Sequence, residues 1–299
     1  MQDYETKVFE DSTIIAQGGS GSTLEARLTA TPDNGTAPLE VLLDASGSTP
    51  KDEIVEYKFD RDGNGSFEYT ETPANHPDGV FDGKTTHTYY TKGNHIPTVT
   101  VSDAQNRADT AEANVVVYQL NTITIQPGPI DGKDAYVDVQ YWPEDPPTYH
   151  GYDTTFLEVN SFGAWVDEAL IQFPLSSIPY DANIVSSKLK LYGQGAFLDE
   201  LATVSVREII GPWNESTVRW DTKPPYGDYV SSSILTDELK WHEFDVTPLV
   251  QSWRGGTNNY GLALTTLDQR PSWEYAFKSS DYSDSSKRPK LEVVYSQTQ

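Results

Sequence analysis

Residues 60–71 carry the motif with the most specific chemical implication in this sequence. They read DRDGNGSFEYTE and match the twelve-residue calcium-loop pattern D-x-D-x-[DN]-G-x5-E. Calcium prefers six to eight oxygen ligands, which alternate residues of a tight turn can point inward. We therefore expect a Ca²⁺ site with the ligands Asp60, Asp62, Asn64, Ser66 (through its backbone carbonyl), Glu68 and Glu71. Because strands rather than helices are expected on either side, an acidic hairpin turn without metal is the alternative.

Aromatic side chains in the second part of the chain, residues 120–299, suggest a different chemistry, the stacking of rings on the C–H faces of sugars. All seven tryptophans lie there. Six aromatic residues fall in stretches rich in Pro, Gly and Asp and form the predicted carbohydrate-binding platform: Trp142, Tyr149, Tyr152, Trp165, Tyr226 and Trp273. Trp213, Trp220 and Trp253 are expected in the core, since large aromatic residues mostly serve burial. An acidic glycan would require a calcium bridge or cationic partners, for which the candidates are Arg207, Arg254, Arg270, Lys278 and Arg288.

Signatures of catalysis are absent from the sequence. There is no cysteine, and the five histidines show no metal-ligand spacing such as H-E-x-x-H. Neither a G-x-S-x-G elbow nor a phosphate-binding loop occurs. A pair of carboxylates acting as a glycosidase is the alternative that 45 acidic residues leave open. The sequence thus predicts a protein that is not an enzyme.

The charge balance excludes one class of partner and favours an extracellular setting. The formal net charge is −24, whereas nucleic-acid binding needs clustered Lys and Arg. No apolar run approaches the roughly 18 residues of a membrane span. The first ten residues are polar and acidic, so we expect that any secretion signal has been removed. We predict a secreted or cell-surface protein that binds no nucleic acid and has no membrane span.

The first part of the chain reads as an arm followed by a β-sandwich. Residues 1–23 contain enough apolar side chains for one strand and end in a Gly/Ser linker at 18–22. That strand is either donated to a neighbouring molecule or part of a loosely attached arm. Residues 24–119 contain short alternating segments separated by turn residues, including 24–28, 39–43, 54–59, 96–101 and 113–117. This pattern is typical of an immunoglobulin-like sandwich.

The second part, residues 120–299, reads as a larger all-β domain. The segment 188–192 (KLKLY) alternates cleanly, and about ten such strands are expected within about 170 residues. Only 247–254 reads as a helical turn. The predicted fold class is therefore all-β, an immunoglobulin-like β-sandwich followed by a jelly-roll β-sandwich.

The first domain resembles PKD (polycystic kidney disease) domains. The resemblance rests on APLEV at 37–41, DASGS at 44–48, YKFD at 57–60, THTY at 86–89 and TVTVSD at 98–103. It implies an immunoglobulin-like spacer or surface-interaction module. Related domains sometimes hold calcium near their first loop, and Asp52 and Asp103 fall at the matching places, although Glu53 replaces the usual glycine.

The second domain resembles the DNRLRE, or disaggregatase-related, family. The blocks that carry this resemblance are DAYVD at 134–138, ALIQFPLSSIP at 169–179, IVSSKLKLY at 184–192, WNESTVRW at 213–220, FDVTPLVQSW at 244–253, NYGL at 259–262 and RPKLEVVY at 288–295. It implies a carbohydrate-binding type of module, directed to acidic polysaccharides or placed in surface proteins of methanogenic archaea and bacteria.

Together these observations predict a non-catalytic extracellular or cell-surface protein that binds polysaccharide, possibly acidic, with calcium-stabilised modules. The alternative is a structural subunit of a surface layer, sheath or filament. Its partners would then be neighbouring surface-protein subunits, assembled through the β-domains and the N-terminal strand.

Overall fold

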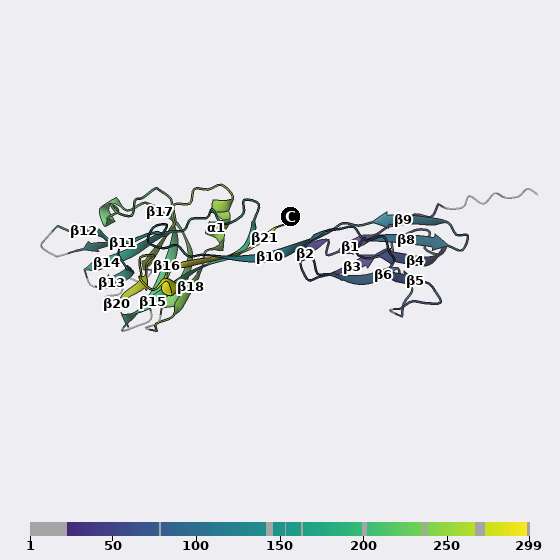
Figure 1. The fold of residues 1–299 in the computed structure, drawn as a ribbon, viewed down its shortest axis with the longest axis horizontal. Helices are drawn as coiled ribbons and strands as arrows, with labels where there is room; N and C mark the ends of the chain where they lie inside the picture. The colour runs from purple at the N-terminus through teal and green to yellow at the C-terminus, as the bar shows by residue number, and fades with distance from the viewer. Residues whose placement is uncertain are drawn as a thin grey trace, which may run out of the picture. The chain divides into compact units, whose positions relative to one another are not determined.

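The computed structural model describes residues 23–77, 79–141, 146–152, 154–162, 164–198, 202–235, 238–266 and 273–297. These residues are mostly β-strand with one α-helix, and they belong to two compact units, with the division along the chain between Val117 and Tyr118 (Figure 1). The all-β prediction is confirmed. The arm at residues 1–22, with its predicted strand, lies outside the described residues.

The first unit contains two sheets around one core. Its strands are β1 (Thr29–Thr31), β2 (Asn34–Thr36), β3 (Leu39–Asp44), β4 (Ile54–Asp60), β5 (Tyr69–Glu71), β6 (Lys84–Tyr89), β7 (Gly93–His95), β8 (Thr98–Asp103), β9 (Ala108–Glu112) and the start of β10 (Val115–Ile125). One sheet has the order β1-β3-β6, and the other has the order β5-β4-β8-β9. Side chains of a strand point alternately to its two faces, and in β3 the side chains of Val41 and Leu43 are buried in the core whereas that of Glu40 is exposed.

One strand predicted in this unit is replaced by irregular chain. Residues 24–28 form no strand, and Glu25 makes only an isolated bridge with Thr49. The backbone N–H groups of Ala26 and Arg27 donate to the side chains of Asp109 and Ser48 instead of to a neighbouring strand. Side-chain oxygens thus accept the backbone N–H groups that, in the strand predicted from the alternating pattern, would have bonded to a neighbouring strand.

The second unit is larger and also surrounds one main core. Its elements are β11 (Lys133–Gln140), β12 (Thr148–Tyr152), β13 (Phe156–Phe162), β14 (Trp165–Gln172), β15 (Asn183–Leu198), β16 (Ala202–Ile209), β17 (Tyr226–Leu235), β18 (Trp241–Asp245), α1 (Thr247–Arg254), β19 (Leu262–Thr266), β20 (Trp273–Lys278) and β21 (Lys290–Gln297), with the short 3-10 turns Trp220–Thr222 and Ser285–Lys287. Helix α1 coincides with the predicted helical turn and buries Leu249, Val250 and Trp253.

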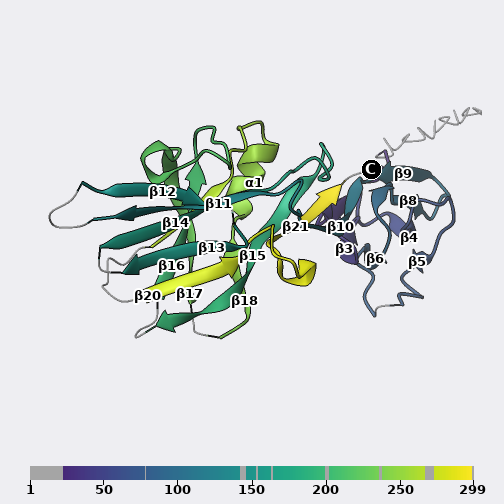
Figure 2. The same cartoon turned by 60° about the vertical axis from the view of Figure 1, so that its left-hand side comes forward.

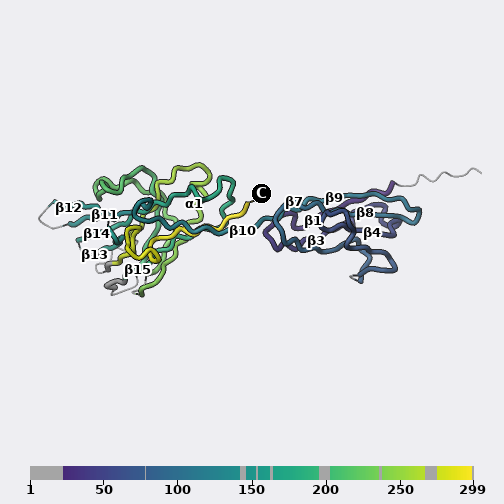
Figure 3. Tube along the Cα trace, viewed as in Figure 1, coloured from purple at the N-terminus to yellow at the C-terminus, as the bar shows by residue number. Residues whose placement is uncertain are grey.

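Two strands of this unit connect its layers. The first half of β15 pairs with β18 and β21, and after a register shift beyond Gly193 the second half pairs with β20. Strand β14 has β11 along one edge, while its other edge is shared by β13 and β19. Figure 2 shows β12, β11, β14, β13 and β20 side by side, and Figure 3 shows the chain ending in β21 beside β10.

The sheet formed by β11, β14 and β19 is covered on one face by the segment 210–226. A small cluster there contains Ala135, Val137, Leu170 and Val218, with Trp213 and Trp220 packed against it. Trp253 is buried as predicted, whereas Trp213 and Trp220 are half-buried beneath the ammonium groups of Lys133 and Lys223. No helix among the described residues is long and apolar enough to cross a membrane.

Candidate functional site

The predicted calcium loop is the connection of a hairpin between β4 and β5. Phe59 pairs with Tyr69, so the chain leaves the ladder after Phe59 and returns to it at Tyr69. The buried Asp60 carboxylate accepts the backbone N–H groups of Gly63, Asn64 and Gly65 at 2.7–3.1 Å. Gly63 and Gly65 have φ of 78° and 90°, a region that favours glycine. The motif therefore orders the loop by local hydrogen bonding.

Three carboxylates of this loop lie close enough to share an ion. One oxygen each from Asp60, Asp62 and Glu68 lie within 4.8 Å of one another, and this is the only such group of acidic, His or Cys side chains in the part of the chain that the structure describes. Asn64 and Ser66 make local hydrogen bonds, since the Asp62 carboxylate accepts the backbone N–H of Asn64 and the side-chain amide oxygen of Asn64 accepts the backbone N–H of Ser66. The loop thus brings together three of the predicted ligands.

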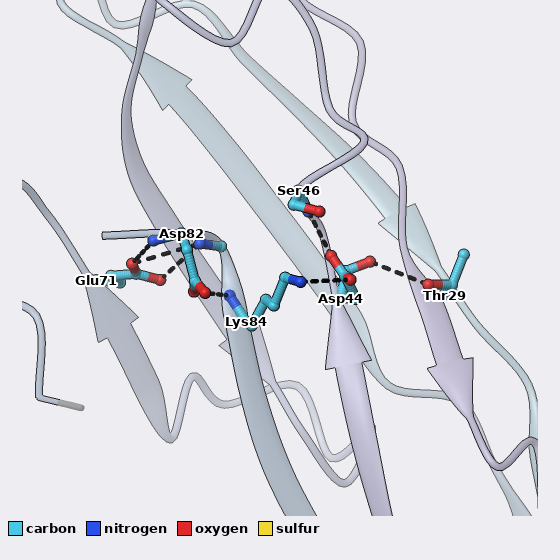
Figure 4. Close-up of polar contacts among 7 residues, drawn as sticks. Thr29, Asp44, Ser46, Glu71, Asp82 and Lys84 are labelled. Atoms are coloured by element: carbon cyan, nitrogen blue, oxygen red, sulfur yellow. Dashed lines mark hydrogen bonds and ion pairs between the residues drawn. The ribbon is translucent and has the colours of Figure 1, made fainter. Parts of the chain in front are cut away.

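Glu71 is not brought to this group, contrary to its predicted position in the ligand shell. Its carboxylate is fully buried and accepts the backbone N–H groups of Asp82, at 2.5 Å, and of Gly83, at 3.1 Å (Figure 4). Figure 4 also shows Lys84 paired with Asp44 across the neighbouring strands, 3.1 Å apart. The reason is the register of the hairpin, because Glu71 pairs with Tyr57, which lies three residues before Asp60 in β4 and therefore away from the loop.

Asp52 and Asp103, the second predicted metal group, are not part of a cluster of three acidic side chains in the described structure. Asp52 is exposed in a turn, and neither residue belongs to the three-carboxylate group above. The buried Asp103 accepts from the Arg107 guanidinium at 2.5 Å, and the same guanidinium reaches Glu53 at 2.6 Å. Burial raises the pKa of Asp103, but the N–H groups of Arg107 and Gln105 outweigh it and hold the pKa low. An arginine already supplies the positive charge that this carboxylate requires.

The second unit brings polar and aromatic side chains together on one face of adjacent strands. Asp138 of β11 lies opposite His150 of β12 on one side and Asp167 of β14 on the other, and Asp167 lies opposite Asn160 of β13. Paired residues of antiparallel strands project to the same face. We call this the polar face, and its members are Tyr136, Asp138, Gln140, His150, Tyr152, Glu158, Asn160, Trp165 and Asp167.

The aromatic members of the polar face form a partly exposed surface. The rings of Tyr136 and Tyr152 stack, with centroids 4.7 Å apart and an angle of 22° between their planes. The ring centroids of His150 and Tyr152 are 5.8 Å apart, and Trp165, the first residue of β14, is 42% exposed. Flat rings of this kind can receive the C–H face of a sugar.

The carboxylates of the polar face are recessed beside these rings. Asp138 and Asp167 are buried, whereas Glu158 is half-buried. Nδ1 of His150 lies 2.7 Å from an oxygen of Asp138, and the amide of Asn160 donates to Asp167. The side-chain amide oxygen of Asn160 is buried without a hydrogen-bond partner in the described structure. Burial raises the pKa of Tyr136, and the charges of Glu158, Asp167 and Asp138 raise it further.

The predicted sugar platform is divided between the two faces of the sheet. Tyr152 and Trp165 belong to the polar face. Tyr149 lies opposite Val139 and points to the other face, and the half-buried Tyr226 donates to Glu168 at 2.8 Å on that same covered face. Trp142 and the side chain of Trp273 lie outside the described residues. The predicted aromatics therefore do not share one face, because strand alternation places Tyr149 on the face opposite Tyr152, and Tyr226 contacts Glu168 on that opposite face.

Most members of the polar face were not among the site residues predicted from the sequence. The signal that could have found them is the alternation in β11, where Tyr136, Asp138 and Gln140 alternate with the buried Val137 and Val139. When polar residues occupy every second position of a strand and apolar residues the positions between them, the apolar face packs in a core and the polar face can serve in binding.

The cations considered for an acidic glycan are occupied elsewhere. Arg207, Arg254 and Arg288 donate to the backbone carbonyls of Gly227, Pro179 and Tyr282, respectively. Lys278 is buried, with its ammonium 4.4 Å and 4.0 Å from the ring centroids of Phe156 and Tyr282. Arg270 lies outside the described residues.

A buried carboxyl group lies in another part of this unit, near a surface hollow of about 420 Å³. The hollow is lined by Lys133, Trp213 and Glu215, among others, and Glu215 accepts the backbone N–H of Asp134 at 2.7 Å. One Asp134 oxygen accepts the N–H of Ser280, and the other is buried without a hydrogen-bond partner. Burial is the main reason that the pKa of Asp134 rises to about 7.

Comparison with known proteins gives low similarity to individual proteins. A segment of 113 residues, 38% of this chain, is 27% identical to the tRNA nuclease WapA of Bacillus subtilis, and the chain spans about one twentieth of that relative's length. Among solved structures, one from work on the promiscuous specificity of β-sandwich carbohydrate-binding modules matches with a TM-score of 0.28 and 12% sequence identity. The match covers 91% of this chain and 96% of that one.

Two surface glycan-binding proteins of Bacteroides also match. One is SGBP-B of Bacteroides ovatus in complex with a mixed-linkage heptasaccharide (12% identity, TM-score 0.19, 87% of this chain and 49% of that one). The other is SGBP-B from a xyloglucan utilization locus of Bacteroides uniformis (11% identity, TM-score 0.25, 86% and 72%). TM-scores this low do not establish a shared fold.

A family model provides the decisive match, because it covers more than half of the chain. It spans residues 130–295, from just before β11 to within β21, and includes every member of the polar face. On this ground the chain belongs to carbohydrate-binding module family 96.

Proposed function

We propose that this protein is a non-catalytic, secreted or cell-surface protein that binds polysaccharide on the polar face of its second unit. The observation that carries the proposal is the stacked Tyr136–Tyr152 pair beside the recessed Asp138 and Asp167, on a face built by four strands of a carbohydrate-binding module. Rings provide a surface for stacking, and the carboxylate and amide groups provide fixed hydrogen-bonding partners for sugar hydroxyls. The first unit, which by sequence resembles PKD domains, serves as a spacer.

Replacing one ring of the pair tests this proposal. Tyr152→Ala is expected to weaken glycan binding at least tenfold, because the variant loses both the stacking of the ring on the sugar and the exclusion of water from that contact. Binding is measured by isothermal titration or by affinity gel electrophoresis with the polysaccharides that retard the wild type. Tyr149→Ala is the matched control, since it removes a tyrosine from the opposite face of the same strand. Equal affinity of Tyr152→Ala and wild type would place the binding surface elsewhere.

Calcium in the Asp60 loop is the second part of the proposal. Asp60, Asp62 and Glu68 offer three carboxylates, and water can complete the shell that calcium requires. The backbone N–H groups that already hold Asp60 reduce the cost of ordering the loop around an ion. The ion would stabilise the β4–β5 hairpin at the end of the first unit.

Thermal unfolding with and without calcium tests this part. Extracellular modules bind calcium with a Kd of about 10⁻⁴–10⁻³ M, so 10 mM calcium should stabilise the first unit by on the order of 1–3 kcal/mol. Asp62, a member of the three-carboxylate group, is the residue to change, and Asp62→Asn should abolish the calcium-induced rise in melting temperature. Glu71→Gln is the control, because it should lower the melting temperature while retaining that rise. The same rise in wild type and Asp62→Asn would contradict the site.

A further inference from the structure

A buried carboxylate oxygen in the second unit has no hydrogen-bond partner in the described structure. It is Oδ1 of Asp134, a residue of β11 that is 1% exposed. The other oxygen, Oδ2, accepts the backbone N–H of Ser280 at 2.9 Å. Protonation would not satisfy Oδ1, because the O–H group would need an acceptor, and none lies within hydrogen-bond distance. A cation or a water molecule bound to Oδ1 would meet the requirement.

Further oxygens gather at the same place from segments that are distant in the sequence. An added Cβ at Gly132 would collide with the hydroxyl oxygen of Ser280 and would lie 2.7 Å from the backbone carbonyl oxygen of Gly128. Glu215, from the segment that covers the sheet, accepts the backbone N–H of Asp134 at 2.7 Å. Carboxylate, hydroxyl and carbonyl oxygens therefore surround the start of β11.

Two further carboxylates lie close enough to act on Asp134. Burial raises the pKa of Asp134, hydrogen bonds from Ser280 oppose that rise, and the charges of Glu215 and Asp281 raise the pKa further. The ammonium group of the adjacent Lys133 does not reach Oδ1, and it donates to a glutamine of β14 at 2.7 Å. Carboxylates held near one another repel, and a cation bound between them relieves that repulsion.

We propose that Asp134 is the central ligand of a calcium site in the second unit. Calcium accepts six to eight oxygens of different types in flexible geometry, whereas magnesium demands a nearly regular octahedron and keeps much of its water. The Ser280 hydroxyl and the Gly128 carbonyl supply neutral ligands. Because the three carboxylates do not all lie within 4.8 Å of one another, one of Glu215 and Asp281 binds the ion through water.

Such an ion would hold three segments together, namely the start of β11, the segment 210–226 and the turn after β20. The surface hollow of about 420 Å³, which Glu215 lines, provides a route for the ion and its water. The site is separate from the Asp60 loop of the first unit, and it does not depend on glycan binding.

Terbium luminescence in the full chain tests the site. Terbium takes the place of calcium and emits when an excited tryptophan lies nearby, and all seven tryptophans belong to residues 120–299. Trp213 lines the hollow together with Glu215, so terbium at Asp134 should emit under excitation of tryptophan. Asp134→Asn should weaken terbium binding at least tenfold, and added calcium, but not magnesium, should displace terbium from the wild type. Unchanged binding by Asp134→Asn would overturn the proposal.

Two matched variants control for other acidic side chains. Asp284→Asn removes an exposed carboxylate that follows the turn after β20, and Asp62→Asn removes one from the Asp60 loop. Both should retain the terbium emission of the wild type. Loss of that emission in Asp284→Asn, to the same extent as in Asp134→Asn, would mean that terbium reports the general acidity of the surface.

Thermal unfolding followed by tryptophan fluorescence is a second readout, and it is confined to the second unit. At pH 8 in EDTA, Asp134→Asn should fold and be more stable than the wild type, since it buries no charge. Calcium at about 10 mM should raise the melting temperature of the wild type by about 3–10 °C and leave that of Asp134→Asn nearly unchanged. An equal response of the two proteins, or no response of the wild type, would overturn the proposal and assign water to Oδ1.

Discussion

Asp134→Asn is expected to be more stable than the wild type at pH 8 and equally stable at pH 4. The pKa of Asp134 rises from 3.8 to about 7 in the folded protein, mainly because burial disfavours the charged form. A group with a raised folded-state pKa binds its proton more tightly when folded, so its contribution is present below pH 4 and is lost as the pH rises through 7. At about 1.4 kcal/mol per pKa unit, the loss is on the order of 4 kcal/mol. Asparagine has a similar shape and carries no charge to desolvate.

Chemical denaturation of both proteins from pH 4 to pH 8 measures this difference. Asp284→Asn is the control in the same unit, because Ser286 and Lys287 lower the pKa of Asp284 by hydrogen bonding. Its loss should reduce stability slightly at neutral pH, the opposite sign to Asp134→Asn. A stability difference between wild type and Asp134→Asn that does not change with pH would show that Asp134 stays ionised.

Gly151→Ala is expected to lower the melting temperature of the second unit by roughly 6–12 °C. An added Cβ at Gly151 would lie 1.7 Å from the backbone carbonyl oxygen of Val218. A backbone group cannot move aside as a side chain does, so either β12 or the segment that covers it must shift. Overpacking costs of roughly 3 kcal/mol convert to this change in a unit of about 180 residues. Because His150 and Tyr152 flank Gly151 on the other face, glycan binding should also weaken.

Differential scanning calorimetry measures the change, with Thr148→Ala as the control. Thr148 is exposed in the same strand, and its loss should shift the transition by no more than about 2 °C. A Gly151→Ala protein that melts within 1 °C of the wild type would mean that the covering segment is not packed against β12.

The sequence alone was sufficient for features formed by residues that are close together along the chain. The Asp60 loop is such a case, because its hydrogen bonds join residues two to five apart and glycine is needed where φ is positive. Helix α1 is another, since its proline start and buried stripe are local. The all-β fold followed from alternation repeated over many short segments.

Only the tertiary structure decided which side chains share a surface. Glu71 completes the calcium motif in sequence, yet the register of β4 and β5 places it under Asp82 and Gly83. Tyr149 and Tyr152 are three residues apart and project to opposite faces, whereas Tyr136 and Tyr152 stack across two strands. The physical reason is that strand register and sheet order, which arise from contacts between distant segments, determine the neighbours of every side chain. The sequence by itself therefore determined the two-part all-β protein and its acidic loop, while the packing of β11, β12, β13 and β14 decided where the polar face lies.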